Sequence, residues 1–331
     1  MAQFVEVEHR GFEATLARCA EVGGVDAIFT SPPYPTENPG ARGKAGAPTR
    51  DYGGDAPKHF LWHDYQALGN LCFEALKPGG FCIVIVDGPI RTCRKTVGSE
   101  RSLIAFKLAI DWAERVGFRY VEHEAYVRLG PPGDFRPRRR SGWEPMHIFQ
   151  RPGSRGFFDA WATPMPSKSA GRTDQNDKGS RDWKGQVRYR GRSDGSPYQR
   201  REERTLTTAI NATKIGPSLG KQSIDIEHRA PFTEWIAKVQ VCAYCPLGGI
   251  TCDPFNGSGT TGIAAAKHGR SFIGGDLGAR ERDGRRWADI GRERAEAAMA
   301  EFAASVGVSP ADPAALPQAT IASDRGQMKL L

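Results

Sequence analysis

Short apolar runs alternate with stretches of helical spacing along most of the chain. Val25–Thr30 and Phe81–Val86 are apolar without polar alternation, which is typical of parallel strands buried on both faces of a sheet. Residues 59–76 and 102–116 instead place apolar side chains on one side of an amphipathic helix. Strands that alternate with helices in this way predict a doubly wound α/β sheet.

The remaining regular segments continue the alternation. Pro32 and Pro33 cannot continue the ladder of the strand before them, so the chain is expected to leave the sheet there in an extended, rigid loop. Residues 35–57 are rich in Gly, Pro and Arg and predict a long surface loop. Further strands are expected at 4–7, 120–129, 145–150, 250–252 and 271–274, and further helices at 11–21, 232–243, 260–268 and 287–302.

The regular pattern stops at about Arg151. Gly, Ser, Arg and Asp dominate residues 155–223, which predicts either a small irregular domain or a region that orders on a partner. Prolines recur near the C-terminus and predict a flexible tail. The expected parts are a first half at 1–150, an irregular region at 151–227, a second half at 228–302 and the tail at 303–331.

Composition narrows the class of protein. The 331 residues can bury a sizeable core, and neither a membrane span nor a signal peptide is evident. Seven cysteines, an odd number scattered through apolar segments, fit reduced thiols in the cytoplasm. Cys242 and Cys245 form a single C-x-x-C pair. A zinc site needs two more ligands, so a structural role in a helix is favoured and no metal is expected.

The net charge of +8 is concentrated in one segment. Residues 128–229 contain 21 Lys and Arg against 11 Asp and Glu, whereas the rest of the chain contains 25 against 27. A basic segment on a nearly neutral scaffold fits a polyanionic partner, and it also fits a merely solvated loop region. Charge alone does not separate these two interpretations.

A glycine-containing turn joins the expected strand at 250–252 to the expected helix at 260–268. Its sequence is Asp253-Pro254-Phe255-Asn256-Gly257-Ser258-Gly259-Thr260-Thr261. Such a turn lets the backbone approach a nucleotide-type ligand, although glycines also mark ordinary strand-to-helix turns. Asp276 ends the next expected strand, where a carboxylate can bind ribose hydroxyls.

Three motifs taken together resemble one family. Asp-Pro-Phe-x-Gly-Ser-Gly-Thr-Thr at 253–261, Phe-Ile-Gly-x-Asp at 272–276 and Thr-Ser-Pro-Pro-Tyr at 30–34 are similar to the signature of β-class S-adenosylmethionine-dependent DNA amino-methyltransferases. The resemblance covers residues 1–150 and 228–300. It implies a Rossmann-like methyltransferase fold with a doubly wound mixed sheet, into which 151–227 is inserted as an irregular target-recognition region. It also implies S-adenosylmethionine as the cofactor and double-stranded DNA as the substrate.

The resemblance also assigns residues to the cofactor and to DNA. In one departure from the family pattern, Arg10-Gly11 stands where members often carry Gly-Asp, whose acid helps to bind adenine; Glu13 is the nearest substitute. The implied cofactor-binding residues are Asp253, Pro254, Phe255, Gly257, Ser258, Gly259, Thr260, Asp276, Pro231 and Phe232. The expected DNA-binding residues are Arg136, Arg138, Arg139, Arg140, Arg188, Arg190 and Arg192.

Ser31, Pro32, Pro33 and Tyr34 are the catalytic residues that the resemblance implies. An exocyclic amine of a base is a poor nucleophile because its lone pair is delocalised into the ring, so the enzyme must chiefly position it. The Ser31 side chain and the Pro32 carbonyl could accept both amine hydrogens, while Tyr34 stacks on the base. The base must first flip out of the duplex.

Ser31 favours cytosine as the target, because cytosine-directed members tend to carry Ser-Pro-Pro-Tyr and adenine-directed members Asp or Asn in place of Ser. The resemblance therefore predicts a site-specific DNA cytosine-N4 methyltransferase, with adenine-N6 transfer as the alternative. An RNA amino-methyltransferase and a non-catalytic DNA-binding module are the other hypotheses. The recognition sequence, the oligomeric state and a cognate restriction endonuclease stay open.

Overall fold

The protein folds as two compact units in a computed structural model that describes residues 3–34, 60–88, 90–93, 98–127, 142–166, 203–211 and 232–307. The larger unit combines Met1–Asp159 with Thr208–Leu331, and the smaller is Ala160–Thr207. In the smaller unit, β8 (Met165–Pro166) pairs antiparallel with β9 (Glu203–Arg204). The smaller unit falls inside the expected irregular region, whose boundaries remain a prediction.

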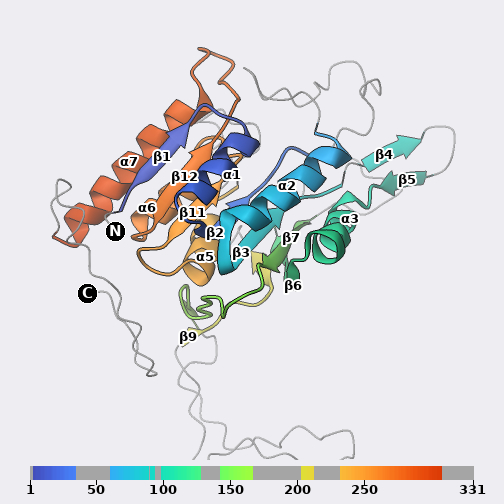
Figure 1. The fold of residues 1–331 in the computed structure, drawn as a ribbon, viewed down its shortest axis with the longest axis horizontal. Helices are drawn as coiled ribbons and strands as arrows, with labels where there is room; N and C mark the ends of the chain where they lie inside the picture. The colour runs from blue at the N-terminus through green and yellow to red at the C-terminus, as the bar shows by residue number, and fades with distance from the viewer. Residues whose placement is uncertain are drawn as a thin grey trace, which may run out of the picture. The chain divides into compact units, whose positions relative to one another are not determined.

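A mixed sheet forms the centre of the larger unit. Among the described residues it has eight strands in the order β1-β12-β11-β2-β3-β7-β6-β10 (Figure 1). Neighbours run parallel except at β7, which is antiparallel to both β3 and β6. The strands are β1 (Val5–Glu8), β2 (Val25–Thr30), β3 (Leu76–Ile85), β6 (Arg119–Val127), β7 (Trp143–Gln150), β10 (Ala209–Asn211), β11 (Ile250–Asp253) and β12 (Ser271–Gly275).

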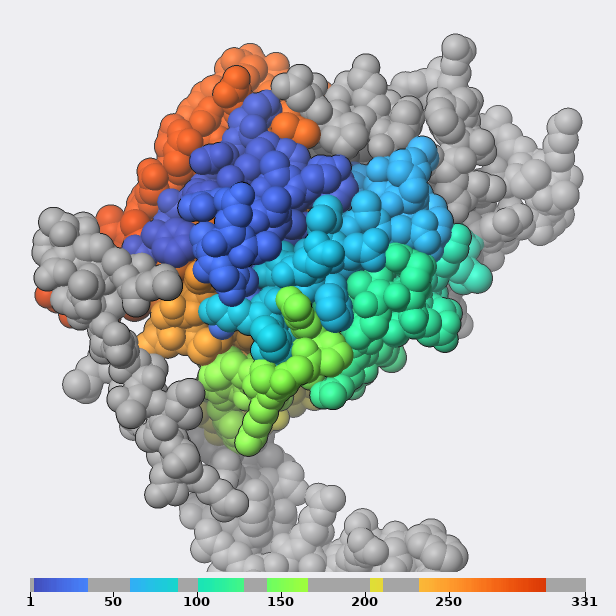
Figure 2. Space-filling view, in the orientation of Figure 1, coloured from blue at the N-terminus to red at the C-terminus, as the bar shows by residue number. Residues whose placement is uncertain are grey.

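Helices cover both faces of this sheet. Successive strand residues point to opposite faces, so Ile273 packs with the cluster under Leu16 of α1, whereas Phe272 packs with Ala288 of α7. Figure 2 shows α1, α2 and α3 side by side across the visible surface. One face carries α1 (Phe12–Glu21), α2 (Trp62–Ala75), α3 (Ile104–Asp111) and the π-helical turn η1 (Trp112–Val116); the other carries α5 (Glu234–Tyr244), α6 (Thr260–Lys267) and α7 (Trp287–Ser305). The doubly wound prediction is confirmed.

Several boundaries differ from the sequence-based expectation. The strand expected at 81–86 starts at Leu76, because the turn residues before it form an irregularity in the β2–β3 ladder, where pairing passes from Val25–Leu76 to Ala27–Phe81. The helix expected at 102–116 is α3 followed by η1, which Gly117 ends at φ 92°. The last helix runs to Ser305, into the expected tail.

Three short strands of the larger unit had not been expected. β4 (Ile90–Cys93) and β5 (Gly98–Arg101) form an antiparallel hairpin. β10 joins the sheet beside β6, and next to it the N–H of Ala125 donates to the carbonyl of Thr208 at 2.7 Å. Three residues are too few to show a period, so only pairing with β6 defines β10 as a strand.

The central pair of strands brings the two main motifs together. β2 and β11 are parallel neighbours, with Ala27 opposite Thr251 and Ile28 opposite Cys252. The chain continues from β2 to β3 on one side and from β11 to β12 on the other, so the strand order reverses between them. Ligands of open α/β sheets bind at the carboxyl ends of such a strand pair. None of the helices in the described ranges is long and apolar enough to cross a membrane.

Candidate active site

Asp253, the last residue of β11, links three elements beneath the glycine turn. It is 1% exposed. Its Oδ1 accepts from the Thr30 hydroxyl at 2.7 Å and from the Phe255 N–H at 3.1 Å, and its Oδ2 accepts from the Thr261 hydroxyl at 2.7 Å. Burial raises the pKa of Asp253 to about 6, although the hydrogen bonds from Thr261 and Thr30 favour the charged form. The carboxylate thus holds the end of β2, the turn and the start of α6 together.

Packing within the protein explains two glycines of the turn region. Gly259 adopts φ 88°, and a Cβ there would lie 2.7 Å from the Cα of Gly291 in α7. Gly262, the third glycine of a G-x-G-x-x-G spacing, approaches the Phe272 ring so closely that its Cβ would lie 2.8 Å away. Gly257 has φ 48°, a conformation that favours glycine. The turn therefore needs glycine for its shape and for its contact with α7 and β12.

Asp276 braces the same turn from the end of β12. Its Oδ2 accepts from the Gly257 N–H at 2.8 Å, and its Oδ1 accepts from the Gly278 N–H at 2.7 Å. Burial raises the pKa of Asp276, while these two backbone bonds favour the charged form. Arg294 of α7 donates to the carbonyl of Ser258 on the other side of the turn. The turn is held from both flanks.

Ser31-Pro32-Pro33-Tyr34 leaves the sheet directly after Thr30, as the two prolines predict. Ser31 and Tyr34 are half-buried, and Tyr34 packs against the core under α1 and α2. The Tyr65 hydroxyl of α2 donates to the Pro33 carbonyl at 2.6 Å. The structure therefore places the loop at the same sheet edge as the glycine turn.

Aromatic rings line this edge on both faces of the sheet. Phe255 of the turn stacks on Phe12 with ring centroids 5.5 Å apart and meets Phe60 edge-on at the same distance. On the other face, the half-buried Phe232 contacts Phe29 of β2 edge-on at 5.1 Å. Pro231, the other residue expected to close the methionine pocket, lies outside the described residues.

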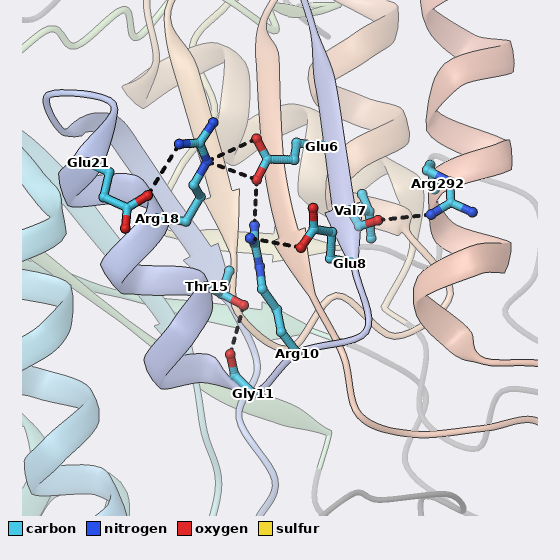
Figure 3. A network of polar contacts seen from close by, with 9 residues as sticks. All are labelled: Glu6, Val7, Glu8, Arg10, Gly11, Thr15, Arg18, Glu21 and Arg292. Carbon is cyan, nitrogen blue, oxygen red and sulfur yellow. Dashed lines mark hydrogen bonds and ion pairs between the residues drawn. The ribbon is translucent and has the colours of Figure 1, made fainter.

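The segment that departs from the family pattern is ordered by ion pairs (Figure 3). The Arg10 guanidinium turns back along β1 to Glu6 at 2.9 Å and Glu8 at 3.3 Å, and Arg18 also binds Glu6 at 3.1 Å. Burial would raise the pKa of Glu6, but the hydrogen bonds from Arg18 and Arg10 outweigh it and lower that pKa. The Arg10 side chain is thus held along β1 by its ion pairs with Glu6 and Glu8.

Glu13 folds back over Gly11 at the start of α1. A Cβ on Gly11 would lie 2.9 Å from Oε2 of Glu13 and 3.5 Å from Cδ1 of Leu277, which directly follows Asp276. The carboxylate of Glu13 therefore occupies the space that an acidic side chain at position 11 would enter. Sequence alone could place Glu13 near the site but not orient it.

A family model described as DNA methylase matches residues 25–283, which is more than half of the chain. The chain belongs to this family. Its cofactor is S-adenosylmethionine. A relative from Bacillus amyloliquefaciens, the orphan methyltransferase M.BamHII, is 23% identical over 276 residues, covering 82% of this chain and 88% of the relative.

Solved structures share the fold of this DNA methylase. The PvuII DNA methyltransferase, described as cytosine-N4-specific, has a TM-score of 0.53 at 12% identity, covering 91% of this chain and 95% of its own. M1.HpyAVI has a TM-score of 0.50 at 15% identity, covering 88% of this chain and 98% of its own. At these identities the likeness establishes the fold.

Other expected sites of the DNA methylase are only partly visible. Arg136, Arg138, Arg139, Arg140, Arg188, Arg190 and Arg192 all lie outside the described residues, so their contacts with DNA remain a prediction. Cys242 and Cys245 are buried free thiols, and no group of three or more potential metal ligands occurs in the part of the chain that the structure describes.

Three polar side chains of the site had been assigned no role from sequence. Thr30 and Thr261 belong to the quoted motifs, and their adjacency to Ser31 and to the turn was the available signal. Nothing in the sequence indicated a role for Tyr65 in the site, because an aromatic residue on an amphipathic helix ordinarily belongs to the core.

Proposed function

We propose that this DNA methylase transfers a methyl group from S-adenosylmethionine to the N4 amine of cytosine within a specific sequence of double-stranded DNA. The observation that carries this proposal is the hydrogen bond from Thr30 to Asp253. It holds Ser31, which directly follows Thr30, next to the turn that starts at Asp253. The loop for the base and the turn for the methyl donor therefore share one sheet edge.

The residues around the turn fit S-adenosylmethionine. The half-buried rings of Phe255 and Phe232 offer apolar walls for the methionine part, and the partly exposed carboxylate of Asp276 suits the ribose hydroxyls, which are hydrogen-bond donors. Glu13 is assigned to the adenine amine, because its carboxylate lies beside Gly11, where a Cβ would come within 2.9 Å of its Oε2. When bound, S-adenosylmethionine supplies a methyl group on a positively charged sulfur, which makes that methyl electrophilic.

Ser31–Tyr34, which we call the base-binding loop, would position the amine of the base for attack on the methyl group. Ser31 and the Pro32 carbonyl accept its two hydrogens, which directs the nitrogen lone pair toward the methyl group and stabilises the charge that develops on nitrogen. Tyr65 occupies the neighbouring Pro33 carbonyl, which leaves the Pro32 carbonyl as the acceptor for the base. Tyr34 stacks on the flipped base.

Ser31 decides for cytosine over adenine in this proposal. A neutral hydroxyl accepts a hydrogen bond from an amine without adding a charge, and family members with Ser-Pro-Pro-Tyr tend to act on cytosine. The PvuII enzyme, with the same fold, is described as cytosine-N4-specific. The base assignment rests on Ser31, since the likeness to that enzyme carries the fold alone.

We assign DNA recognition to residues 151–227 and phosphate contacts to Arg136, Arg138, Arg139 and Arg140, with Arg188, Arg190 and Arg192 in the recognition region. Residues 1–150 would carry the base pocket and 228–302 the cofactor site. The basic composition of 128–229 supports this assignment.

Transfer of labelled methyl from S-adenosylmethionine to duplex DNA, followed by nucleoside mass analysis, tests the proposed function. N4-methylcytosine is the expected product. N6-methyladenine as the sole product would contradict the base assignment, and labelling of RNA without DNA would contradict the substrate. Sequencing of the modified DNA then identifies the recognition sequence.

A further inference from the structure

Tyr65 contacts the base-binding loop from a helix that follows it in the sequence. Its side chain is fully buried, and its hydroxyl donates to the carbonyl of Pro33, 32 residues earlier, at 2.6 Å. Its own backbone carbonyl accepts from Nε1 of Trp112 at 3.0 Å, a buried bond between α2 and η1. Tyr65 is therefore a buried and well-braced donor aimed at the loop.

The Tyr65 ring also belongs to a row of aromatic rings that ends at the glycine turn. Tyr65 meets Phe60 edge-on at 4.7 Å, Phe60 meets Phe255 edge-on at 5.5 Å, and Phe255 stacks on Phe12 at 5.5 Å. Such ring contacts are directional and resist sliding. Tyr65 is thus hydrogen-bonded to the base-binding loop through its hydroxyl. Through Phe60 it packs toward the glycine turn at Asp253–Thr261, which we call the cofactor turn.

The bond to Pro33 orients more than one atom. The peptide between Pro33 and Tyr34 is planar, so fixing the Pro33 oxygen also fixes the plane from which Tyr34 departs. It also keeps the Pro33 carbonyl away from the amine, which directs the amine to the Pro32 carbonyl. Deviations of about 1 Å in a reacting geometry can cost about a hundredfold in rate.

We infer that Tyr65 is a positioning residue that sets the base-binding loop in register with the cofactor turn. It acts through the Pro33 carbonyl and the Phe60 ring, and it does not touch the reacting atoms. The inference rests on the proposed function, because it assumes that Pro32 and Tyr34 hold the target base. It adds a residue of α2 to the site.

The test compares Tyr65→Phe with Tyr120→Phe. Both changes delete one tyrosine hydroxyl that makes a hydrogen bond, but Tyr120 is 39% exposed and its hydroxyl bonds Nδ1 of His147 on β7 at 2.9 Å. Turnover, the dissociation constant for S-adenosylmethionine and the melting temperature would be measured for both variants. Fluorescence of a duplex with pyrrolocytosine, a fluorescent cytosine analogue, in place of the target cytosine within the site mapped for the wild-type protein would report how the flipped base is held.

Tyr65→Phe is expected to lower kcat about tenfold or more. It should change the dissociation constant of S-adenosylmethionine by less than about twofold and raise the mobility of the flipped pyrrolocytosine. Tyr120→Phe should leave turnover and fluorescence near wild type, and because Tyr120 is exposed its melting temperature should fall less than that of Tyr65→Phe. If Tyr65→Phe does not fold, Phe60→Leu keeps the hydroxyl and interrupts the row of rings, and it should lower kcat with cofactor affinity retained.

Equal turnover of the two tyrosine variants, beside an active wild type, would refute the positioning role of Tyr65 and leave the proposed function intact. A parallel loss of cofactor affinity and turnover in Tyr65→Phe would also refute it, because the residue would then support the cofactor turn generally. A wild-type protein that transfers no methyl group to DNA would refute the proposed function, and the inference with it.

Discussion

The hydroxyl of Thr30 donates a hydrogen bond to the carboxylate of Asp253 at 2.7 Å, across 223 residues of sequence. Both residues are buried, so the bond is shielded from water and is one of three hydrogen bonds that the carboxylate accepts. Thr30 ends β2 and directly precedes the base-binding loop, and Asp253 ends β11 and starts the cofactor turn. The bond therefore couples the positions of the two halves of the site.

Thr30→Val is expected to destabilise the protein and impair transfer. Valine keeps the shape but removes one of the two donors to Oδ1 of Asp253 and leaves only the Phe255 N–H, which costs about 1.5–3 kcal/mol because the acceptor is charged. Unfolding in urea and single-turnover methyl transfer measure the two effects. Thr251→Val on β11, whose buried hydroxyl makes no hydrogen bond within the part of the chain that the structure describes, is the control and should cost less than about 1 kcal/mol. An equal loss in the free energy of unfolding at the two positions would show that the hydrogen bond from Thr30 to Asp253 does not stabilise the protein more than an ordinary buried hydroxyl does.

Gly259→Ala is expected to destabilise the cofactor turn strongly. The new Cβ meets the backbone of Gly291 at 2.7 Å and also forces φ 88° on a residue with a side chain. Gly284→Ala imposes a similar conformation, φ 70°, with nothing within 4 Å of the new Cβ. Conformation alone costs about 1–2 kcal/mol, so Gly284→Ala should fall in that range and Gly259→Ala above it. Chemical denaturation measures the free energy of unfolding of both variants, and the difference between them gives the cost of the clash with Gly291 beyond the backbone strain.

Ser31→Ala and Tyr34→Ala are expected to reduce turnover with cofactor affinity largely kept. Each removes a group that the proposal places on the base rather than on S-adenosylmethionine, so kcat should fall by about tenfold or more while the dissociation constant of the cofactor stays within about twofold. Calorimetric titration with the cofactor and steady-state kinetics provide the comparison. Loss of cofactor binding in both variants would show that the loop binds S-adenosylmethionine rather than the base, and would contradict the proposal.

Asp276→Ala and Glu13→Gln are expected to weaken cofactor binding, each for its own reason. Asp276→Ala removes the acceptor for the Gly257 N–H as well as the proposed ribose contact. Glu13→Gln keeps the side chain in place and replaces the carboxylate proposed to accept from the adenine amine, a change of about 1 kcal/mol or fivefold in affinity. Glu21→Gln, on the same helix, should bind as wild type does. Unchanged affinity in Glu13→Gln would remove this residue from the adenine site.

Glu124 gives the protein a testable pH dependence of stability. Burial raises the pKa of Glu124 to about 7, although Gln240 donates a hydrogen bond to it at 2.6 Å. The folded state then binds a proton more tightly than the unfolded state, so this contribution to stability is complete below about pH 4.5 and is lost as the pH rises to about 7. One pKa unit corresponds to about 1.4 kcal/mol, so the loss is up to about 3 kcal/mol.

Glu124→Gln should remove most of this slope in the free energy of unfolding between about pH 4.5 and 7. The exposed Glu122, two residues away on β6, serves as the control, and Glu122→Gln should retain most of it. Urea titrations at several pH values measure the difference. Identical slopes in wild type and Glu124→Gln would mean that Glu124 ionises as an ordinary exposed carboxylate does.

The amino-acid sequence determined the strands and helices that have a clear period. Val25–Thr30 is a strand because an apolar run followed by two prolines has few other conformations, and the alternation of such runs with helical spacing was sufficient to predict a doubly wound sheet. The resemblance of their motifs to one family implied that Ser31–Tyr34 and the glycine turn form one site, in agreement with the rule that ligands bind at the carboxyl edge of parallel strands.

Only the tertiary structure decided which side chains hold that site in place. Thr30 meets Asp253, Gly259 meets Gly291 and Tyr65 meets Pro33 because β2, β11, α7 and α2 pack together, and each pair is brought together by the path of the chain rather than by local preference. β10 likewise exists only because β6 offers an edge to pair with. Hydrogen bonds and close contacts between distant residues depend on exact distances in the folded core, and residue type and spacing do not encode those distances directly.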